Sequence, residues 1–176
     1  MGSRGIVAAG RRTPHLRNPD LALIIAEERI ERKMSNVYES DFYAWAMEQA
    51  ALLRARRFDT ADIDNIAEEN ESMGRGEKRE LVNRLAVLLL HLLKWQFQPG
   101  FRSPSWSATI REQRLRLSDH LSDNPSLSAH LDEALNRAYR LAVIGAARET
   151  GMPESVFPKS SPYSFDEAAD ETFWPT

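Results

Sequence analysis

The stretch from Glu77 to Gln98 constrains the fold more than any other part of the chain. It contains nine consecutive residues, Leu85 to Leu93, that are apolar except for His91. On a helical period, apolar side chains cover more than half of the circumference, and a helix of this kind has to be surrounded by other elements. We therefore expect a central core helix from Glu77 to Gln98 with one polar stripe along its side.

Helical patterns continue on both sides of this stretch, and no segment of useful length alternates apolar and polar residues as a strand does. Gly74 and Gly76 are typical of a helix end, so we expect the chain to break between the core helix and the helix before it. The other predicted helices run from Ser40 or Asp41 to about Arg57, from Asp62 to Met73, from Ser103 or Ser105 to about Leu121, and from Leu127 to Glu149. The predicted fold class is all-α, a single-domain bundle of about five helices.

The two ends of the chain differ from this pattern. After Met152, four prolines alternate with aromatic residues, which predicts an extended tail across the bundle with one short helix near Asp166 to Glu171. Residues 1–36 are predicted to be a poorly ordered N-terminal extension with a short amphipathic helix, LALIIAEERIER. We expect residues 1–33 to lie upstream of a helical bundle domain that comprises residues 37–176.

Composition excludes several classes of protein. The absence of cysteine rules out disulfides, thiolate catalysis and cysteine-based metal sites. A net charge of −3 gives no overall basic field for duplex nucleic acid, and the longest apolar run is too short to predict a membrane span. We expect a cytoplasmic protein with no cofactor.

Polar side chains interrupt the apolar faces of four predicted helices. An unpaired buried amide costs about 1–3 kcal/mol, so these groups should bond to one another, to the backbone or to water. Two interpretations remain open: a satisfied polar network that fixes the helix register, or a polar pocket inside the bundle. The residues concerned are Gln49, Asn70, Arg84, His91 and Gln113.

Arg84 and His91 lie two helical turns apart on the same side of the core helix. An Arg followed after six residues by a His is similar to the signature of the HEPN ribonucleases, which are all-helical. That resemblance implies proton transfer by His91 and neutralisation of phosphate charge by Arg84, with Glu77 or Lys94 in support. The alternative function is therefore metal-independent RNA cleavage, with RNA as partner.

Two smaller groups of charged residues are further candidates for a binding site. Glu68 and Glu71 share one side of a helix, but no histidine follows a glutamate at the spacing that bundle metal sites use, so no metal site is expected. Arg75, Lys78 and Arg79 form a basic group that solvation explains most simply and that could also border an anionic partner.

A series of ordered motifs between Tyr38 and Pro175 resembles one bacterial family, domain-of-unknown-function family number 29. The motifs include DFYAW, DIDNIAEE, SMGRGEKREL, LLLHLLKWQFQP, RSPSW and TIREQR. The resemblance implies a small all-helical protein and supplies no activity. Without a complete catalytic constellation, the sequence favours a non-enzymatic interaction or regulatory module that binds an unknown protein partner or itself.

Overall fold

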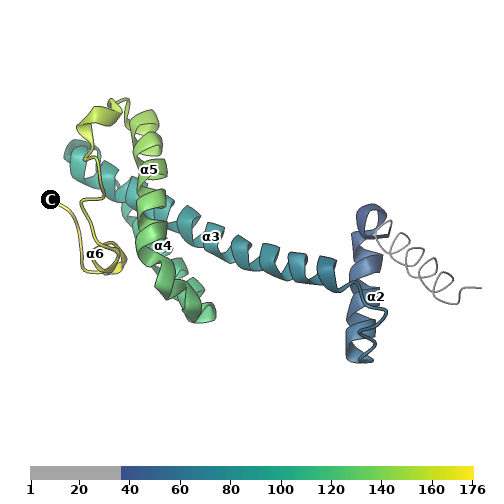
Figure 1. Cartoon of the computed structure of the whole chain (residues 1–176). Helices are drawn as coiled ribbons and strands as arrows, with labels where there is room; N and C mark the ends of the chain where they lie inside the picture. The colour runs from purple at the N-terminus through teal and green to yellow at the C-terminus, as the bar shows by residue number, and fades with distance from the viewer. Residues whose placement is uncertain (1–36) are drawn as a thin grey trace, which may run out of the picture. The chain divides into compact units, whose positions relative to one another are not determined.

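The computed structural model describes residues 37–176, and every regular element in that range is a helix (Figure 1). The predicted all-α class is thus confirmed for the described residues. The chain divides between Ala67 and Glu68 into two compact units, each with its own packing. The predicted extension, residues 1–36, lies outside the described range.

The first unit is organised around helix α2 (Phe42–Arg54) and the carboxylate of Asp62. Of the two predicted caps, Ser40 and Asp41, it is Asp41 that caps α2 with its side chain. The indole Nε1 of Trp45, which is buried, donates to Asp62 Oδ2 at 3.2 Å, and the backbone N–H of Asp62 donates to Gln49 Oε1 at 2.9 Å. These bonds explain why an amide, Gln49, stands on the otherwise apolar inner face of α2.

Helix α3 runs from Ile63 to Phe97, so the predicted break at Gly74 and Gly76 is wrong. Glycine inside a helix costs roughly 1 kcal/mol relative to alanine, but it ends a helix only when it adopts a left-handed conformation. Neither glycine has a positive φ, and the ion pair between Glu71 and Arg75 bridges one turn here at 3.2 Å. Good helix formers on both sides therefore carry the helix through.

The second unit packs α4 (Pro104–Asp123) and α5 (Leu131–Thr150) against the C-terminal half of α3 (Figure 1). Alanines at helical spacing on α5 let it approach α3 closely. At Gly145 an added Cβ would collide with the side chain of Leu90. The side chains that are fully buried in this core are Leu81, Leu85, Leu88, Leu89, Leu92, Leu93, Ile110 and Leu117.

Short 3₁₀ turns connect the long helices. The turn η2 (Pro125–His130) replaces the first part of the helix predicted from Leu127. The N–H of Leu127 donates to the Asn124 carbonyl at 3.0 Å, and this tighter winding places the Leu127 side chain in the core. The remaining short elements are η1 (Pro99–Phe101), η3 (Glu154–Val156) and α6 (Phe165–Ala169).

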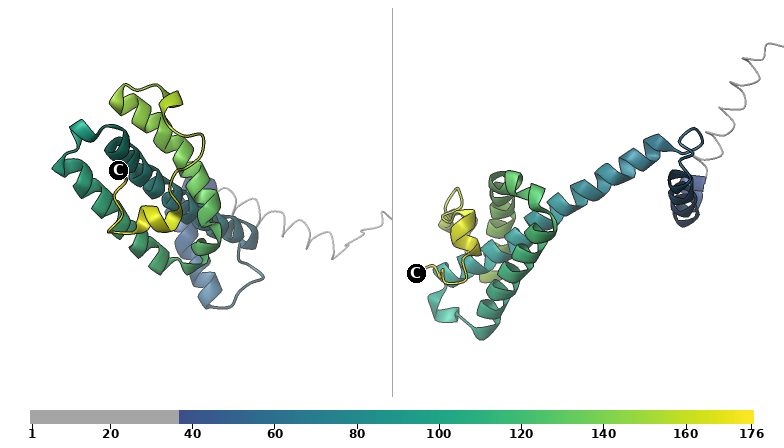
Figure 2. Two further views of the ribbon diagram at one scale, coloured as in Figure 1. Left: turned by 90° about the vertical axis from the view of Figure 1, so that its left-hand side faces the viewer. Right: turned by 90° about the horizontal axis from the view of Figure 1, so that it is seen from below.

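The C-terminal tail lies across α4 and α5, with α6 between them (Figure 2). Its attachment depends on Arg114 of α4, which is buried. The guanidinium donates to the backbone carbonyls of Ala168, Glu171 and Phe173 at 2.9, 3.3 and 2.7 Å. It also lies 5.4 Å from the ring of Trp174. Arg114 therefore fixes the path of the chain from the end of α6 to Phe173.

We expect Arg114→Met to release this tail, because three carbonyls lose a charged donor at once. The loss in the free energy of unfolding should be about 2–4 kcal/mol. Hydrogen exchange should quicken across residues 165–174, whereas the exposed Arg111→Met on the same helix should change stability by no more than about 0.5 kcal/mol. Unchanged protection of the tail amides in the Arg114 variant would contradict this role.

Candidate functional site

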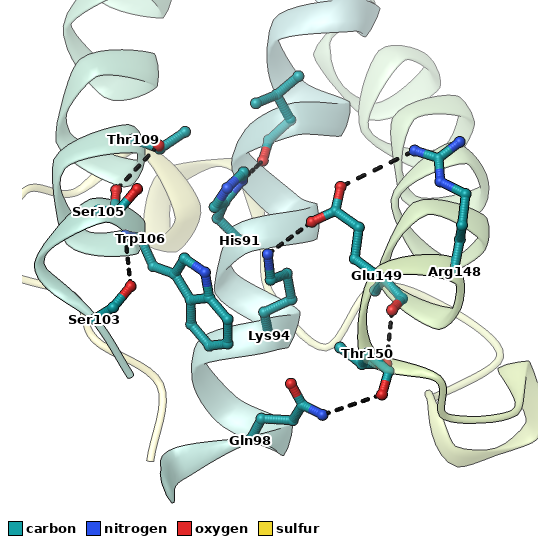
Figure 3. Close-up of polar contacts among 12 residues, drawn as sticks. His91, Lys94, Gln98, Ser103, Ser105, Trp106, Thr109, Arg148, Glu149 and Thr150 are labelled. Atoms are coloured by element: carbon teal, nitrogen blue, oxygen red, sulfur yellow. Dashed lines mark hydrogen bonds and ion pairs between the residues drawn. The ribbon is translucent and has the colours of Figure 1, made fainter. Parts of the chain in front are cut away.

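The C-terminal half of α3 directs a group of polar side chains into the space between α4 and α5 (Figure 3). His91, Lys94 and Gln98 follow one another at helical spacing, so all three lie on one side of α3. This is the polar stripe that the sequence predicts, and in the second unit it meets neighbouring helices.

Lys94 is the most deeply buried residue of this stripe, with 7% of its surface exposed. Its Nζ donates to Glu149 Oε2 of α5 at 2.7 Å and lies 4.4 Å from the ring centroid of Trp106 of α4 (Figure 3). A carboxylate on one side and an aromatic face on the other stabilise the buried ammonium. Glu149 remains 38% exposed, so water reaches the far side of the pair.

His91 lies one turn before Lys94 and is partly buried. Its Nδ1 is 2.9 Å from the carbonyl oxygen of Val87, so the tautomer with a proton on Nδ1 donates to that oxygen. Burial lowers the pKa of His91, and the charge of Lys94 lowers it further, while the Val87 carbonyl and Glu149 oppose the shift. The neutral imidazole is therefore favoured at neutral pH.

Gln98 closes the stripe at the end of α3. Its Nε2 donates to the backbone carbonyl of Thr150 at 3.4 Å, which ties the last turn of α3 to the last turn of α5. The Thr150 hydroxyl in turn donates to the carbonyl of Ala146 at 2.7 Å. The first bond joins the two helix ends, and the second lies within α5.

The predicted catalytic residues bond to groups outside the predicted set. Arg84 pairs with Glu80 one turn earlier at 2.7 Å, and its Nε is buried with no hydrogen-bond partner among the described residues. The carbonyl of Glu77 receives a bond from His120 Nε2 if that nitrogen carries the proton, at 3.0 Å. Among the described contacts, none joins Arg84 to His91, so their joint action stays a prediction.

The predicted polar network is spread over different surroundings. Gln49 is buried in the first unit, where its Nε2 has no hydrogen-bond partner among the described residues. Asn70 is exposed, and Gln113 is half-buried. The two buried polar residues of α4 that sequence reasoning missed are Arg114 and His120.

A spacing signal for the missed residues exists in the sequence. Arg114 lies four residues after Ile110 and three before Leu117, which places it on the apolar stripe of α4. His120 lies three residues after Leu117 on the same stripe. Gln113, one residue earlier than Arg114, lies beside that stripe. Trp106 lies on this stripe as well, four residues before Ile110, but only the packing of α4 and α5 brings Trp106 and Glu149 to Lys94.

Helix α2 of the first unit has a second apolar face opposite Trp45. Tyr43 and Met47 are 75% and 52% exposed, and Ala50 continues their stripe at helical spacing. Buried and exposed apolar faces on a single helix distinguish α2 from an ordinary surface helix, which has only one.

The charged residues around Lys78 surround a cavity of about 370 Å³ between α3 and α5. The basic group predicted from Arg75, Lys78 and Arg79 lies on one wall, and Arg137 of α5 adds a fourth cation. Within residues 37–176, no group of three metal-ligating side chains gathers. Nor is any helix in that range long and apolar enough to cross a membrane.

Comparison with known proteins places the chain in a family. The model of a family described as "Domain of unknown function DUF29" matches residues 37–174. The chain belongs to this family. No curated protein and no solved structure matches it. All residues of the polar stripe, the α2 face and the cavity lie within the DUF29 match, and the family carries no assigned activity.

We expect the two halves of the Lys94 ion pair to respond differently to substitution. Glu149→Ala leaves a buried ammonium without its anionic partner and should cost about 1–3 kcal/mol in the free energy of unfolding. Lys94→Met keeps the apolar stem and leaves Glu149 in contact with water, so it should cost less. Chemical denaturation measures both.

The exposed pair of Glu112 and Arg116 on α4 provides the control for this comparison. Glu112→Ala should change stability by about 0.5 kcal/mol or less, because exposed pairs contribute little. If Glu149→Ala and Glu112→Ala cost the same, the Lys94 ion pair has no special role in holding α3 to α5.

The lowered pKa of His91 predicts a pH dependence of stability. In the unfolded chain the histidine takes up a proton near pH 6.5, whereas in the folded chain it does so at lower pH. Stability should therefore fall as the pH decreases from about 7.5 to about 5.5, since the unfolded state binds more protons there. Denaturation midpoints of His91→Gln should fall less over this interval than those of the wild type. Equal slopes for the wild type and the variant would exclude His91 as the source.

Proposed function

We propose that this protein is a non-enzymatic helical interaction module of the bacterial cytoplasm, and that it pairs with a second copy of itself through α2. The observation that carries the proposal is the apolar stripe formed by the exposed Tyr43 and Met47 and the partly buried Ala50. Water contact with such a stripe is unfavourable, and burial against a matching helix removes it.

Charge supports a second copy as the occupant. Acidic residues, Glu39 and Asp41, stand at the start of α2, and basic residues, Arg54, Arg56 and Arg57, follow at its end. When two such helices pair antiparallel, the acidic end of each faces the basic end of the other. Parallel pairing would bring like charges together.

The size of α2 sets the strength of this pairing. Thirteen residues form a helix about 20 Å long. The area that one face of such a helix can bury is smaller than the roughly 800 Å² per partner of a standard interface. Pairing should therefore be reversible, with a dissociation constant in the micromolar range or weaker. Reversible pairing is suited to a regulatory module, whose state then depends on its concentration.

The polar residues of α3 support a structural role over catalysis. Lys94 holds Glu149 and Trp106, and His91 bonds to the carbonyl of its own helix. These side chains therefore serve contacts within the second unit. RNA cleavage by His91 and Arg84 remains the alternative prediction, and no described contact between the two side chains favours it.

Sedimentation velocity of the full chain from low micromolar to millimolar concentration tests the proposal. We expect the wild type to move from monomer to dimer, and the double variant Tyr43→Glu with Met47→Glu to remain monomeric. Leu141→Glu with Ile144→Glu is the matched control, because these α5 side chains are also about half exposed but lie on another helix. A wild type that stays monomeric at every concentration overturns the proposal, and so does a dimer that the α2 variant leaves intact.

The absence of cysteine allows a direct test of the antiparallel arrangement. Met47→Cys introduces a single thiol at the centre of the stripe, where the two copies meet, and it should form a disulfide-linked dimer under mild oxidation. Glu48→Cys, exposed on a different side of α2, should remain mostly monomeric. Equal cross-linking at both positions would show that collisions, and not a defined interface, join the chains.

A further inference from the structure

The cavity between α3 and α5 in the second unit has an unusual balance of charge. Four basic side chains line it against one acidic side chain. Its volume, about 370 Å³, falls in the range of small-molecule sites, roughly 300–1,000 Å³. The lining residues are Arg75, Lys78, Arg79 and Val82 of α3, and Glu133, Ala134 and Arg137 of α5.

Two of the four cations are already paired. Lys78 Nζ lies 2.6 Å from Glu133 Oε2, and Arg75 bonds to Glu71 on its own helix at 3.2 Å. Arg79 and Arg137 form no ion pair with any residue from 37 to 176, and both are exposed. Their guanidinium groups, one from each helix, are therefore available to an anion that enters between them.

The start of α5 adds to the positive character of this cavity. Glu133 and Ala134 belong to its first turn, where the helix dipole favours negative charge. The N-cap residue, His130, makes no side-chain cap bond. The hydrogen bond and the charge of Lys78 lower the pKa of Glu133, and His130 and Arg137 lower it further, which agrees with a positive potential at this point.

We propose that this cavity binds a small molecule through a diphosphate group. A guanidinium group can donate two hydrogen bonds to one phosphate. Arg79 and Arg137 line opposite walls of the cavity, so each can bind one of two adjacent phosphates. Lys78, positioned by Glu133, supplies a third cation. No aromatic side chain is among the lining residues, so the site recognises the charged group and not a stacked base. The site is separate from α2, and its test does not depend on self-pairing.

Isothermal titration calorimetry of the full chain with pyrophosphate, at constant ionic strength, tests this site. We expect one molecule bound per chain and weaker binding as salt is raised. Arg79→Gln and Arg137→Gln should each weaken binding about tenfold, because each removes a charge-assisted contact. Arg140→Gln is the control, since Arg140 is exposed on α5 and does not line the cavity.

Glu133→Gln provides a variant with the opposite expected effect. It removes the one negative charge from the lining, so pyrophosphate should bind more tightly, by about threefold to tenfold. A damaged fold would not produce that gain. Circular dichroism of each variant checks that the helices are intact.

Three results would overturn the proposal. They are no binding of pyrophosphate by the wild type, equal binding by the wild type and by the Arg79 and Arg137 variants, and binding of a glutamate-rich peptide with none of pyrophosphate. The last result would show that the cavity recognises an acidic protein segment.

Discussion

The burial of the leucine-rich half of α3 is the constraint on which the second unit depends. Six leucines of this half lose all contact with water, whereas Asn83 and Val87 on the other side stay exposed, so other elements have to cover the leucine-rich face of the helix. Helices α4 and α5 supply most of the cover, and the C-terminal tail completes it (Figure 2). A polar residue at the covered face, such as Lys94, therefore has to find partners on the helices that cover it.

Two buried cations show how the unit accommodates charge. Lys94 is stabilised by a carboxylate and an indole, while Arg114 is stabilised by backbone carbonyls and a second indole. In each case the cation joins elements that are distant in sequence: Lys94 joins α3 to α5 and α4, and Arg114 joins α4 to the tail. Polar partners that replace water around a buried charge offset its desolvation cost, and they also fix the position of the partner element. Their main consequence here is the placement of helices.

The candidate functions lie on surfaces that this core leaves available. The apolar stripe of α2 lies in the first unit, and the basic cavity between α3 and α5 lies in the second. Membership of the DUF29 family extends over both without assigning an activity to either. Sequence analysis found three of the four cavity cations, since they are neighbours on one helix. It could not find Arg137, because its place on the opposite wall depends on how α5 packs against α3.

The sequence by itself determined the all-α class, the central position of the leucine-rich segment and most helix starts, because periodic apolar faces and capping residues such as Asp41 and Ser103 act locally. The continuity of α3 through Gly74 and Gly76 needed the structure, since a glycine stops a helix only in a conformation that sequence does not specify. Tertiary structure alone decided the partners of the polar residues. Lys94 meets Glu149 across 55 positions of sequence, and Arg114 meets the tail across a similar separation. Periodicity indicates which face a residue occupies, but only packing decides what it meets there.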